Sequence, residues 1–319
     1  MHSRLRRVPA APLLLLFVLT LLGGAGLGAC GRDVSADDGA AVATTAATAT
    51  FPVTVASEQG DVTIEGRPQR IVSLSPSLTE VLFAIGAGDQ VIAVDKSSDH
   101  PSGTPMTDLS GFRPNLEGIG GHEPDLVVLA NDRDGIVAAL AGLHIPTLLL
   151  SSPDDLDRVY EQVEVLGTAT GHPAEAAALT RTMRDGLAPV EGADERAAPR
   201  RYYLELSATG HSVTSHTFIG EVLAAAGLVS IADGVADAAG GYPQLSAEFV
   251  LDADPDVVLL AYAGGDTPTA ESVAARPGWG QLTAVREDRV IVLDSDLSSR
   301  WGPRPVSYTH LTLPTIYSV

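Results

Sequence analysis

Cysteine and lysine are almost missing from this chain of 319 residues, since each occurs once, as Cys30 and Lys96. A single cysteine cannot form an intramolecular disulfide or a multi-cysteine zinc or iron–sulfur site. Lys and Arg together number 20 against 40 Asp and Glu, which gives a formal net charge of −20 at pH 7. A chain without a basic patch has little to attract a phosphate backbone, so the composition argues against nucleic-acid binding.

Two motifs of common enzymes are also missing. The chain has no Gly-x-Ser-x-Gly sequence, which presents the nucleophile of many hydrolases. Lys96 is not preceded by the glycines of a phosphate-binding loop. An exported hydrolase that uses a serine such as Ser75 and a histidine such as His100 is therefore a remote alternative. We predict no enzymatic activity and no cofactor, and no metal site, because the spacing of His and carboxylates does not indicate three or four convergent ligands.

The N-terminal apolar run is too short to be a membrane span. Residues 13–22 follow three arginines and precede small residues that end at Cys30. A membrane-spanning helix needs about 20 residues, so this pattern predicts a secretory signal. Residues 27–30 resemble the lipobox of bacterial lipoproteins, which implies lipidation of Cys30. We predict a signal peptide over 1–29, a flexible tether over 30–52, and a lipid anchor on the outer face of the cytoplasmic membrane; the alternative is a soluble secreted protein.

The chain nearly repeats itself. Residues 78–86 and 219–227 each carry apolar residues at helical spacing and end at a glycine, with Glu80 and Glu221 in the same register. At about 100° per residue, both glutamates lie away from the apolar stripe and are predicted to face solvent.

A second pair of segments repeats with the same internal spacing. Glu117 precedes Pro124-Asp125, and Glu248 precedes Pro255-Asp256 by the same number of residues. Repetition at this length indicates two related lobes.

Apolar strands alternate with helices in both halves, which indicates parallel sheets covered on both faces. Strands are expected at 70–73, 91–94, 126–130, 147–150, 202–206, 257–261 and 290–293, with an edge hairpin pairing 53–55 and 62–64. Helices are expected at 77–85, near 117, and at 135–141, 154–166, 173–190, 219–226 and 271–282. The helix that opens at Pro173 would be roughly 27 Å long and could cross between lobes.

These patterns predict the division of the chain. The N-terminal lobe is placed at 53–170, the bridging helix region at 171–199 and the C-terminal lobe at 200–305. The tail over 306–319 has no helical periodicity and resembles translated adapter sequence, so we predict that it is not native.

Residues 70–80, the segments around Glu117 and Asp125, and their second copies resemble the substrate-binding proteins of bacterial importers for iron chelates and vitamin B12. The likeness covers about residues 53–305. It implies two Rossmann-like α/β lobes bridged by one long helix, with a ligand cleft between them. It also implies a monomer that serves an ABC permease and its ATPase subunits. Glu80 matches an outward acid that docks on the permease, and Glu221 is its counterpart.

Ligands of open α/β sheets bind at loops that follow the carboxyl ends of strands. The cleft candidates on such loops are Ser75, Ser97, Asp99, His100, Phe112, Arg113, Arg133, Tyr242, Tyr262, Arg300 and Trp301. Arg300 and Trp301 could instead pack near a terminal helix.

The leading ligand is cobalamin. Residues 95–101, 242–246 and 295–304 are similar to the matching segments of cobalamin binders. Aromatic walls such as Phe112, Tyr242 and Trp301 would suit the broad apolar faces of a corrinoid.

Two other ligands stay open. Haem would take an iron ligand from His100, His211 or His216 and pair a propionate with Arg113 or Arg300. A ferric siderophore would require several convergent arginines.

Overall fold

The computed structural model describes residues 50–187, 199–235, 239–262, 267–294 and 300–305. The predicted signal peptide, Cys30, most of the tether and the tail over 306–319 lie outside the described residues. Within the described ranges, no helix is both long enough and apolar enough to cross a bilayer.

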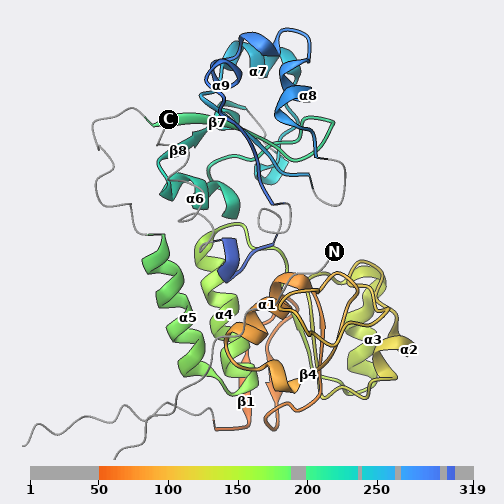
Figure 1. Ribbon diagram of the computed structural model, residues 1–319. Helices are drawn as coiled ribbons and strands as arrows, with labels where there is room; N and C mark the ends of the chain where they lie inside the picture. Colours follow the sequence, from red (N-terminus) through yellow and green to blue (C-terminus); the bar gives the residue numbers. More distant parts are fainter. Residues whose placement is uncertain (1–49, 188–198, 236–238, 263–266, 295–299, 306–319) are drawn as a thin grey trace, which may run out of the picture. The chain divides into compact units, whose positions relative to one another are not determined.

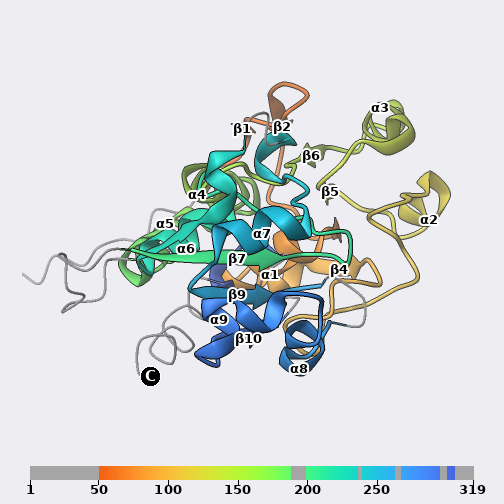
Figure 2. The same ribbon diagram turned by 90° about the horizontal axis from the view of Figure 1, so that it is seen from above.

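Each half of the described chain builds one four-stranded parallel sheet (Figure 1). The first sheet runs β4-β3-β5-β6 and contains β3 (Ile71–Leu74), β4 (Val91–Val94), β5 (Leu126–Leu129) and β6 (Thr147–Leu149). The second runs β8-β7-β9-β10 and contains β7 (Arg200–Glu205), β8 (Leu228–Ser230), β9 (Val257–Leu260) and β10 (Val290–Val292). The two orders are equivalent, and Figure 2 shows β7, β9 and β10 side by side. The predicted α/β fold class is therefore confirmed.

The predicted hairpin is also confirmed. β1 (Val53–Val55) pairs antiparallel with β2 (Val62–Ile64).

Most predicted helices occur within a few residues of their expected bounds. The α-helices are α1 (Pro76–Ala84), α2 (Leu116–Gly120), α3 (Ile136–Gly142), α4 (Leu156–Thr170), α5 (Pro173–Gly186), α6 (Phe218–Ala225), α7 (Ala247–Ala253), α8 (Ala270–Ala274) and α9 (Thr283–Arg286). Short 3₁₀ turns occur at η1 (Gly88–Gln90), η2 (Arg133–Gly135), η3 (Ile231–Gly234), η4 (Ala239–Gly241) and η5 (Trp279–Gln281).

The helix predicted over 271–282 is wrong. It is broken after α8, because Pro277 cannot continue a helical hydrogen-bond ladder and Gly278 has φ +83°.

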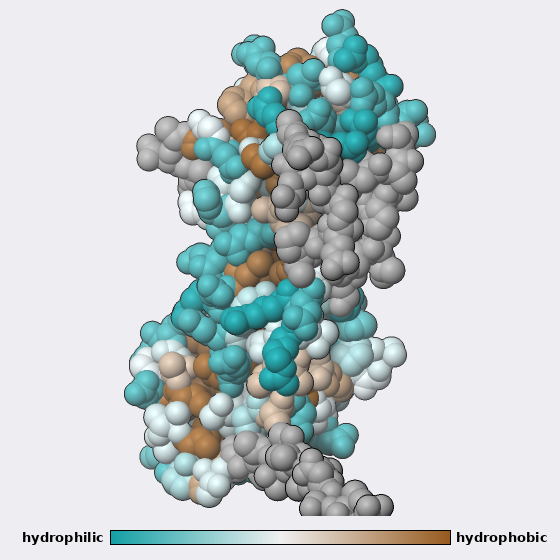
Figure 3. Space-filling model, turned by 90° about the vertical axis from the view of Figure 1, so that its left-hand side faces the viewer, coloured by the Kyte–Doolittle hydropathy of each residue, from teal (hydrophilic) through white to brown (hydrophobic). Residues whose placement is uncertain are grey.

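The strands β5 and β9 are buried at every position, which explains why they are continuous apolar runs. In the first sheet, Ile71 and Val128 pack with α1 and α4, whereas Val72 and Val127 pack with α3. The second sheet is covered in the same way by two further apolar clusters. On the face seen in Figure 3, hydrophilic residues predominate and apolar residues lie in separated patches.

Two helices contribute to apolar clusters of both halves. In α4, Val159 packs with second-sheet residues and Val163 packs with first-sheet residues. In α5, Ala176 and Met183 divide in the same way. We predicted that one helix in residues 171–199 bridges the two lobes; in the structure, α4 and α5 both contact the two halves. The predicted domain boundaries stay predictions.

The duplicated Pro-Asp pairs tie strands together. The Asp125 carboxylate accepts the backbone N–H groups of Gln69 (2.7 Å) and Arg70 (2.9 Å) at the start of β3. Asp256 accepts the N–H of Arg201 in β7 (2.8 Å). Each aspartate therefore fixes the start of one central strand against its neighbour.

Candidate functional site

Phe112 stands at the carboxyl end of the first sheet because of the glycine before it. A Cβ on Gly111 would lie 2.1 Å from the carbonyl oxygen of Leu74, the last residue of β3, so only glycine fits. Asp95 accepts the Gly111 N–H (3.4 Å), and the Asn131 side chain donates to the Gly111 carbonyl (2.8 Å). The loop is held tightly, while the Phe112 side chain is 60% exposed.

The exposed ring of Phe112 is backed by a cation. The Arg133 guanidinium carbon lies 3.9 Å from the centroid of the ring, a cation–π distance. These two predicted candidates are therefore brought together. Arg113 points elsewhere and lines a separate cavity of about 610 Å³ with Asn115 and His122.

Buried hydroxyl groups support this edge of the sheet. Thr79 Oγ1 donates to Ser73 Oγ (2.8 Å) and lies 3.2 Å from Ser98 Oγ. Ser98 Oγ in turn donates to Asp95. Ser75, a predicted ligand contact, is buried beside this network at 3% exposure, so a ligand cannot reach its side chain directly in this structure.

Arg300 holds the loop after β4. Its guanidinium donates to the Asp99 carboxylate (2.8 Å) and to the Ser97 carbonyl (3.2 Å). The hydrogen bond from Arg300 holds the pKa of Asp99 below its ordinary value. His100 follows on the same loop and is half-buried. Three predicted cleft residues, Ser97, Asp99 and Arg300, thus lie together.

Glu80 does not face solvent, so that prediction is wrong. It is 3% exposed, and its carboxylate binds Arg300 (3.2 Å) and Arg304 (2.7 Å from Nε). Residues 300–305 cover this part of α1 and enclose the Glu80 side chain. The Trp301 N–H donates to Ser77 Oγ (3.1 Å), which fixes that segment in place.

Glu221 is half-buried rather than free in solvent. Its carboxylate accepts the N–H of Leu156 (2.8 Å), the first residue of α4. A carboxylate at a helix N-terminus is stabilised by the unpaired N–H groups there. Trp301 also reaches α4, because its ring N–H donates to the Gln162 side chain (3.0 Å).

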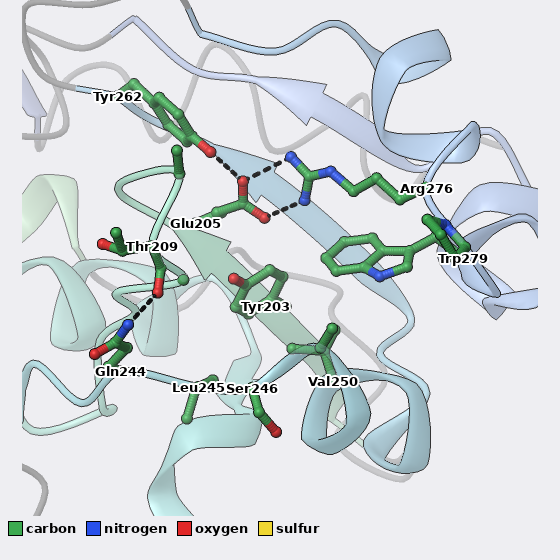
Figure 4. Close-up of a pocket in the computed structure, with 14 residues that line it drawn as sticks. Tyr203, Glu205, Thr209, Gln244, Leu245, Ser246, Val250, Tyr262, Arg276 and Trp279 are labelled. Atoms are coloured by element: carbon green, nitrogen blue, oxygen red, sulfur yellow. Dashed lines mark hydrogen bonds and ion pairs between the residues drawn. The ribbon is translucent and has the colours of Figure 1, made fainter.

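The second sheet carries a pocket at its carboxyl end (Figure 4). The cavity has a volume of about 570 Å³, within the range usual for small-molecule sites. It is lined by Tyr203, Glu205, Ala208, Thr209, Gly210, Gln244, Leu245, Ser246, Ala247, Val250, Tyr262, Arg276, Pro277 and Trp279. We call this cavity the second-lobe pocket.

A charged cluster forms one wall of the second-lobe pocket. Glu205, the last residue of β7, is 2% exposed and accepts two hydrogen bonds from Arg276, at 2.6 and 2.8 Å. The Tyr262 hydroxyl also donates to Glu205 (Figure 4). Burial, together with the neighbouring carboxylate, raises the pKa of Tyr262 to about 12. The same carboxylate raises the pKa of Arg276.

Aromatic rings form another wall. The Arg276 guanidinium lies 4.6 Å from the Trp279 ring centroid. Trp279 meets Tyr203 edge to face at 6.0 Å. Beside these rings, the lining includes the Gln244 side chain, which donates to the Thr209 carbonyl (2.7 Å).

The sequence pointed to Tyr262 but missed Glu205, Arg276 and Trp279. One signal was present. When the two halves are aligned through Asp125 and Asp256, Glu205 takes the position of Leu74, and each pairs with the last residue of its neighbouring strand. A charge in place of a core leucine could have marked the site.

The remaining predicted side chains lie outside this pocket's lining. Tyr242 is 44% exposed. His211 Nδ1 lies within hydrogen-bond distance of Ser207 (3.1 Å) and Thr209 (3.0 Å), and His216 is exposed. In the part of the chain that the structure describes, no group of three or more His, Cys, Asp or Glu side chains is arranged to hold a metal ion.

Two related parallel sheets, each with polar and aromatic side chains at its carboxyl end, define the α/β class of ligand-binding proteins. A family model described as periplasmic binding protein matches residues 71–297, and the chain belongs to that family. Members are substrate-binding proteins of ABC importers that act outside the cytoplasm. They are not enzymes and use no cofactor.

The chain is similar to several named proteins. It is 30% identical over 313 residues to YvrC of Bacillus subtilis, an uncharacterised ABC transporter substrate-binding lipoprotein, covering 93% of this chain and 95% of that one. It is 32% identical over 266 residues to a cobalamin-binding protein of Halobacterium salinarum, covering 80% and 72%. A periplasmic haem-binding protein of Pseudomonas aeruginosa has a similar structure, with a TM-score of 0.66, 25% identity and coverage of 79% and 93%.

Proposed function

We propose that this protein captures a corrinoid such as cobalamin and delivers it to an ABC importer. The observation that carries the proposal is the exposed Phe112 ring, held at the carboxyl end of the first sheet by Gly111 and backed by Arg133. A rigid aromatic face at this place suits a broad macrocycle. The likeness to a cobalamin-binding protein supports the same choice.

Three arginines are engaged by carboxylates of the chain itself and so give less support to an anionic ligand. Arg300 and Arg304 bind Glu80, and Arg276 binds Glu205. A ferric siderophore would require several arginines that converge on the ligand, and haem would require partners for its propionates. Haem stays the second candidate, because the structural relative from Pseudomonas aeruginosa is named as a haem-binding protein.

Ligand retention tests this proposal. Purified protein is incubated with cyanocobalamin, haemin or a hydroxamate ferric siderophore, and absorbance spectra are recorded after gel filtration. We expect stoichiometric retention of the corrinoid, and at least a tenfold weaker affinity after Phe112→Ala. Leu143→Ala removes another exposed apolar side chain (53%) and serves as the matched control. A Soret band or a siderophore band without corrinoid retention would overturn the proposal.

The docking acids expected on the two lobes are better matched by Glu117 and Glu248. Both are exposed, both lie in the first turn of a short helix, and both belong to the duplicated segments. Glu80 and Glu221 instead bind groups of the chain itself. We therefore propose that Glu117 and Glu248 contact the permease.

Reversal of charge tests this docking role. Glu117→Arg with Glu248→Arg is expected to leave corrinoid affinity unchanged and to abolish stimulation of the importer's ATPase. Glu164→Arg with Glu271→Arg reverses two other exposed acids as a control. Normal stimulation by the first pair would remove Glu117 and Glu248 from the interface.

We also propose that the protein is a monomer anchored to the membrane through lipid on Cys30. Cys30→Ala is expected to move the protein from the membrane fraction to the soluble fraction after cell fractionation. Membrane retention of this variant would exclude the anchor.

A further inference from the structure

The second-lobe pocket is lined by one anionic and one cationic side chain, Glu205 and Arg276, which form an ion pair with each other. Arg276 directs two N–H groups at the Glu205 carboxylate, at 2.6 and 2.8 Å. Tyr262 supplies a further hydrogen bond to Glu205. The remaining side chains of the lining are uncharged. Among the described residues of the lining, the pocket therefore offers no charge that lacks an oppositely charged partner.

The fold does not require a carboxylate at position 205. The equivalent position in the first sheet is Leu74, which pairs with Leu129 as Glu205 pairs with Leu260. Burial of an ion pair is costly, and an apolar pair of similar volume is often at least as stable. The ion pair in the second half therefore calls for an explanation in ligand recognition.

The pocket suits a group that both donates and accepts hydrogen bonds without carrying charge. Thr209, Gln244 and Ser246 supply uncharged polar groups, and Trp279 supplies an apolar wall. A carboxylate in the same place would approach Glu205 and would find Arg276 already engaged. Like charges in a site of low dielectric repel, and a buried carboxylate without a partner is costly.

We infer that the second-lobe pocket takes an uncharged, amide-bearing group of the ligand, and that Glu205 excludes carboxylates by keeping Arg276 engaged. This inference rests on the proposed corrinoid function, since a corrinoid carries amides on its rim. Tyr262 acts as a positioning residue, because its hydroxyl, protonated at neutral pH, donates to the same Glu205 carboxylate oxygen as Arg276 Nη2. Glu205 thereby makes the pocket bind ligands with amide groups more tightly than ligands with carboxylates.

Two matched probes test the inference. They are cyanocobalamin and cyanocobalamin monocarboxylates, in which one peripheral amide has been hydrolysed. The full chain is expected to bind cyanocobalamin about tenfold or more tightly than at least one monocarboxylate isomer. In Glu205→Gln, Arg276 is released from its carboxylate partner, and the preference is expected to disappear or reverse. Glu164→Gln, at an exposed position, is the control and should keep the preference.

If circular dichroism shows that Glu205→Gln is unfolded, a second variant is used for the same test. Glu205→Gln with Arg276→Gln has the same net charge as the original pocket, and its preference is expected to fall below that of the unmodified chain without reversing. An unchanged preference in the folded variants would overturn the inference alone. If the unmodified chain retains no corrinoid, the proposed function itself falls.

Discussion

The two halves of the molecule have the same topology but differ in the side chains at the carboxyl ends of their sheets. Both sheets have the same strand order, and both central strands are fixed at their start by an aspartate. At the carboxyl end, the first half presents an exposed Phe112 above a buried hydroxyl network. The second half presents a cavity with a buried ion pair. The two halves thus share a scaffold and differ at the ends of their strands.

Glu80 and Glu221 show the same divergence on the helices. Both occupy the same register, yet Glu80 is buried against two arginines and Glu221 caps another helix. Helical register decides which way a side chain points from its own helix. It does not decide which other segment covers that face.

The largest expected difference between the halves is in the free energy of unfolding that is lost when these two glutamates are replaced. Glu80→Gln leaves Arg300 and Arg304 without their shared carboxylate, and breaking such a buried pair costs about 3–5 kcal/mol. Glu221→Gln weakens a helix-terminal contact worth about 1 kcal/mol. Urea unfolding followed by circular dichroism measures both. Equal losses would show that burial of Glu80 adds nothing to stability.

The next largest effect is expected at Gly111. Gly111→Ala forces a methyl group against the Leu74 carbonyl and should lower the free energy of unfolding by about 1–3 kcal/mol. Displacement of Phe112 should also weaken ligand binding. Gly120→Ala, where nothing lies within 4 Å of the added carbon, is the control and should be close to neutral. An unaffected Gly111→Ala variant would mean that the Phe112 loop is not fixed by this contact.

A smaller effect is expected at the strand-start aspartates. Asp125 accepts two backbone N–H groups and Asp256 accepts one, so Asp125→Asn should cost more, about 2 kcal/mol against about 1 kcal/mol. Thermal unfolding of the two single variants compares them directly. The reverse order would show that the second half depends more on this anchor.

The smallest effect is spectroscopic and concerns Tyr262. Its pKa is raised to about 12, so the neutral form is favoured in the folded state. Its contribution to stability is therefore fully present below pH 10 and is lost as the pH rises through about 12. The difference in tyrosinate absorbance between the unmodified chain and Tyr262→Phe follows this single group. Glu205→Gln should lower the titration midpoint, and an unchanged midpoint would leave burial as the sole cause.

Local patterns predicted most of the fold. The hairpin strands and β4 match the predicted bounds, and α5 begins at Pro173 as expected. Such elements depend on hydrophobic periodicity and on turn residues, which neighbouring sequence contains. The break at Pro277-Gly278 was also visible in the sequence and was overlooked.

The site was harder to predict because its contacts join distant residues. Glu80 meets Arg300 across 220 positions, and Glu205 meets Arg276 across 71. The spacing of apolar residues along the sequence does not indicate which distant residues form such a pair. The sequence did place Phe112, Arg133 and Tyr262 on loops at strand ends, because that depends on strand order alone.

The chain's two tryptophans lie in different parts of the molecule. Trp279 belongs to the second-lobe pocket, whereas Trp301 is hydrogen-bonded to Ser77 and Gln162. Each is therefore a natural fluorophore for one region. In a Trp301→Phe protein the emission reports the pocket, and in a Trp279→Phe protein it reports the segment that covers Glu80. Quenching by a coloured macrocycle would then show which region the ligand approaches first.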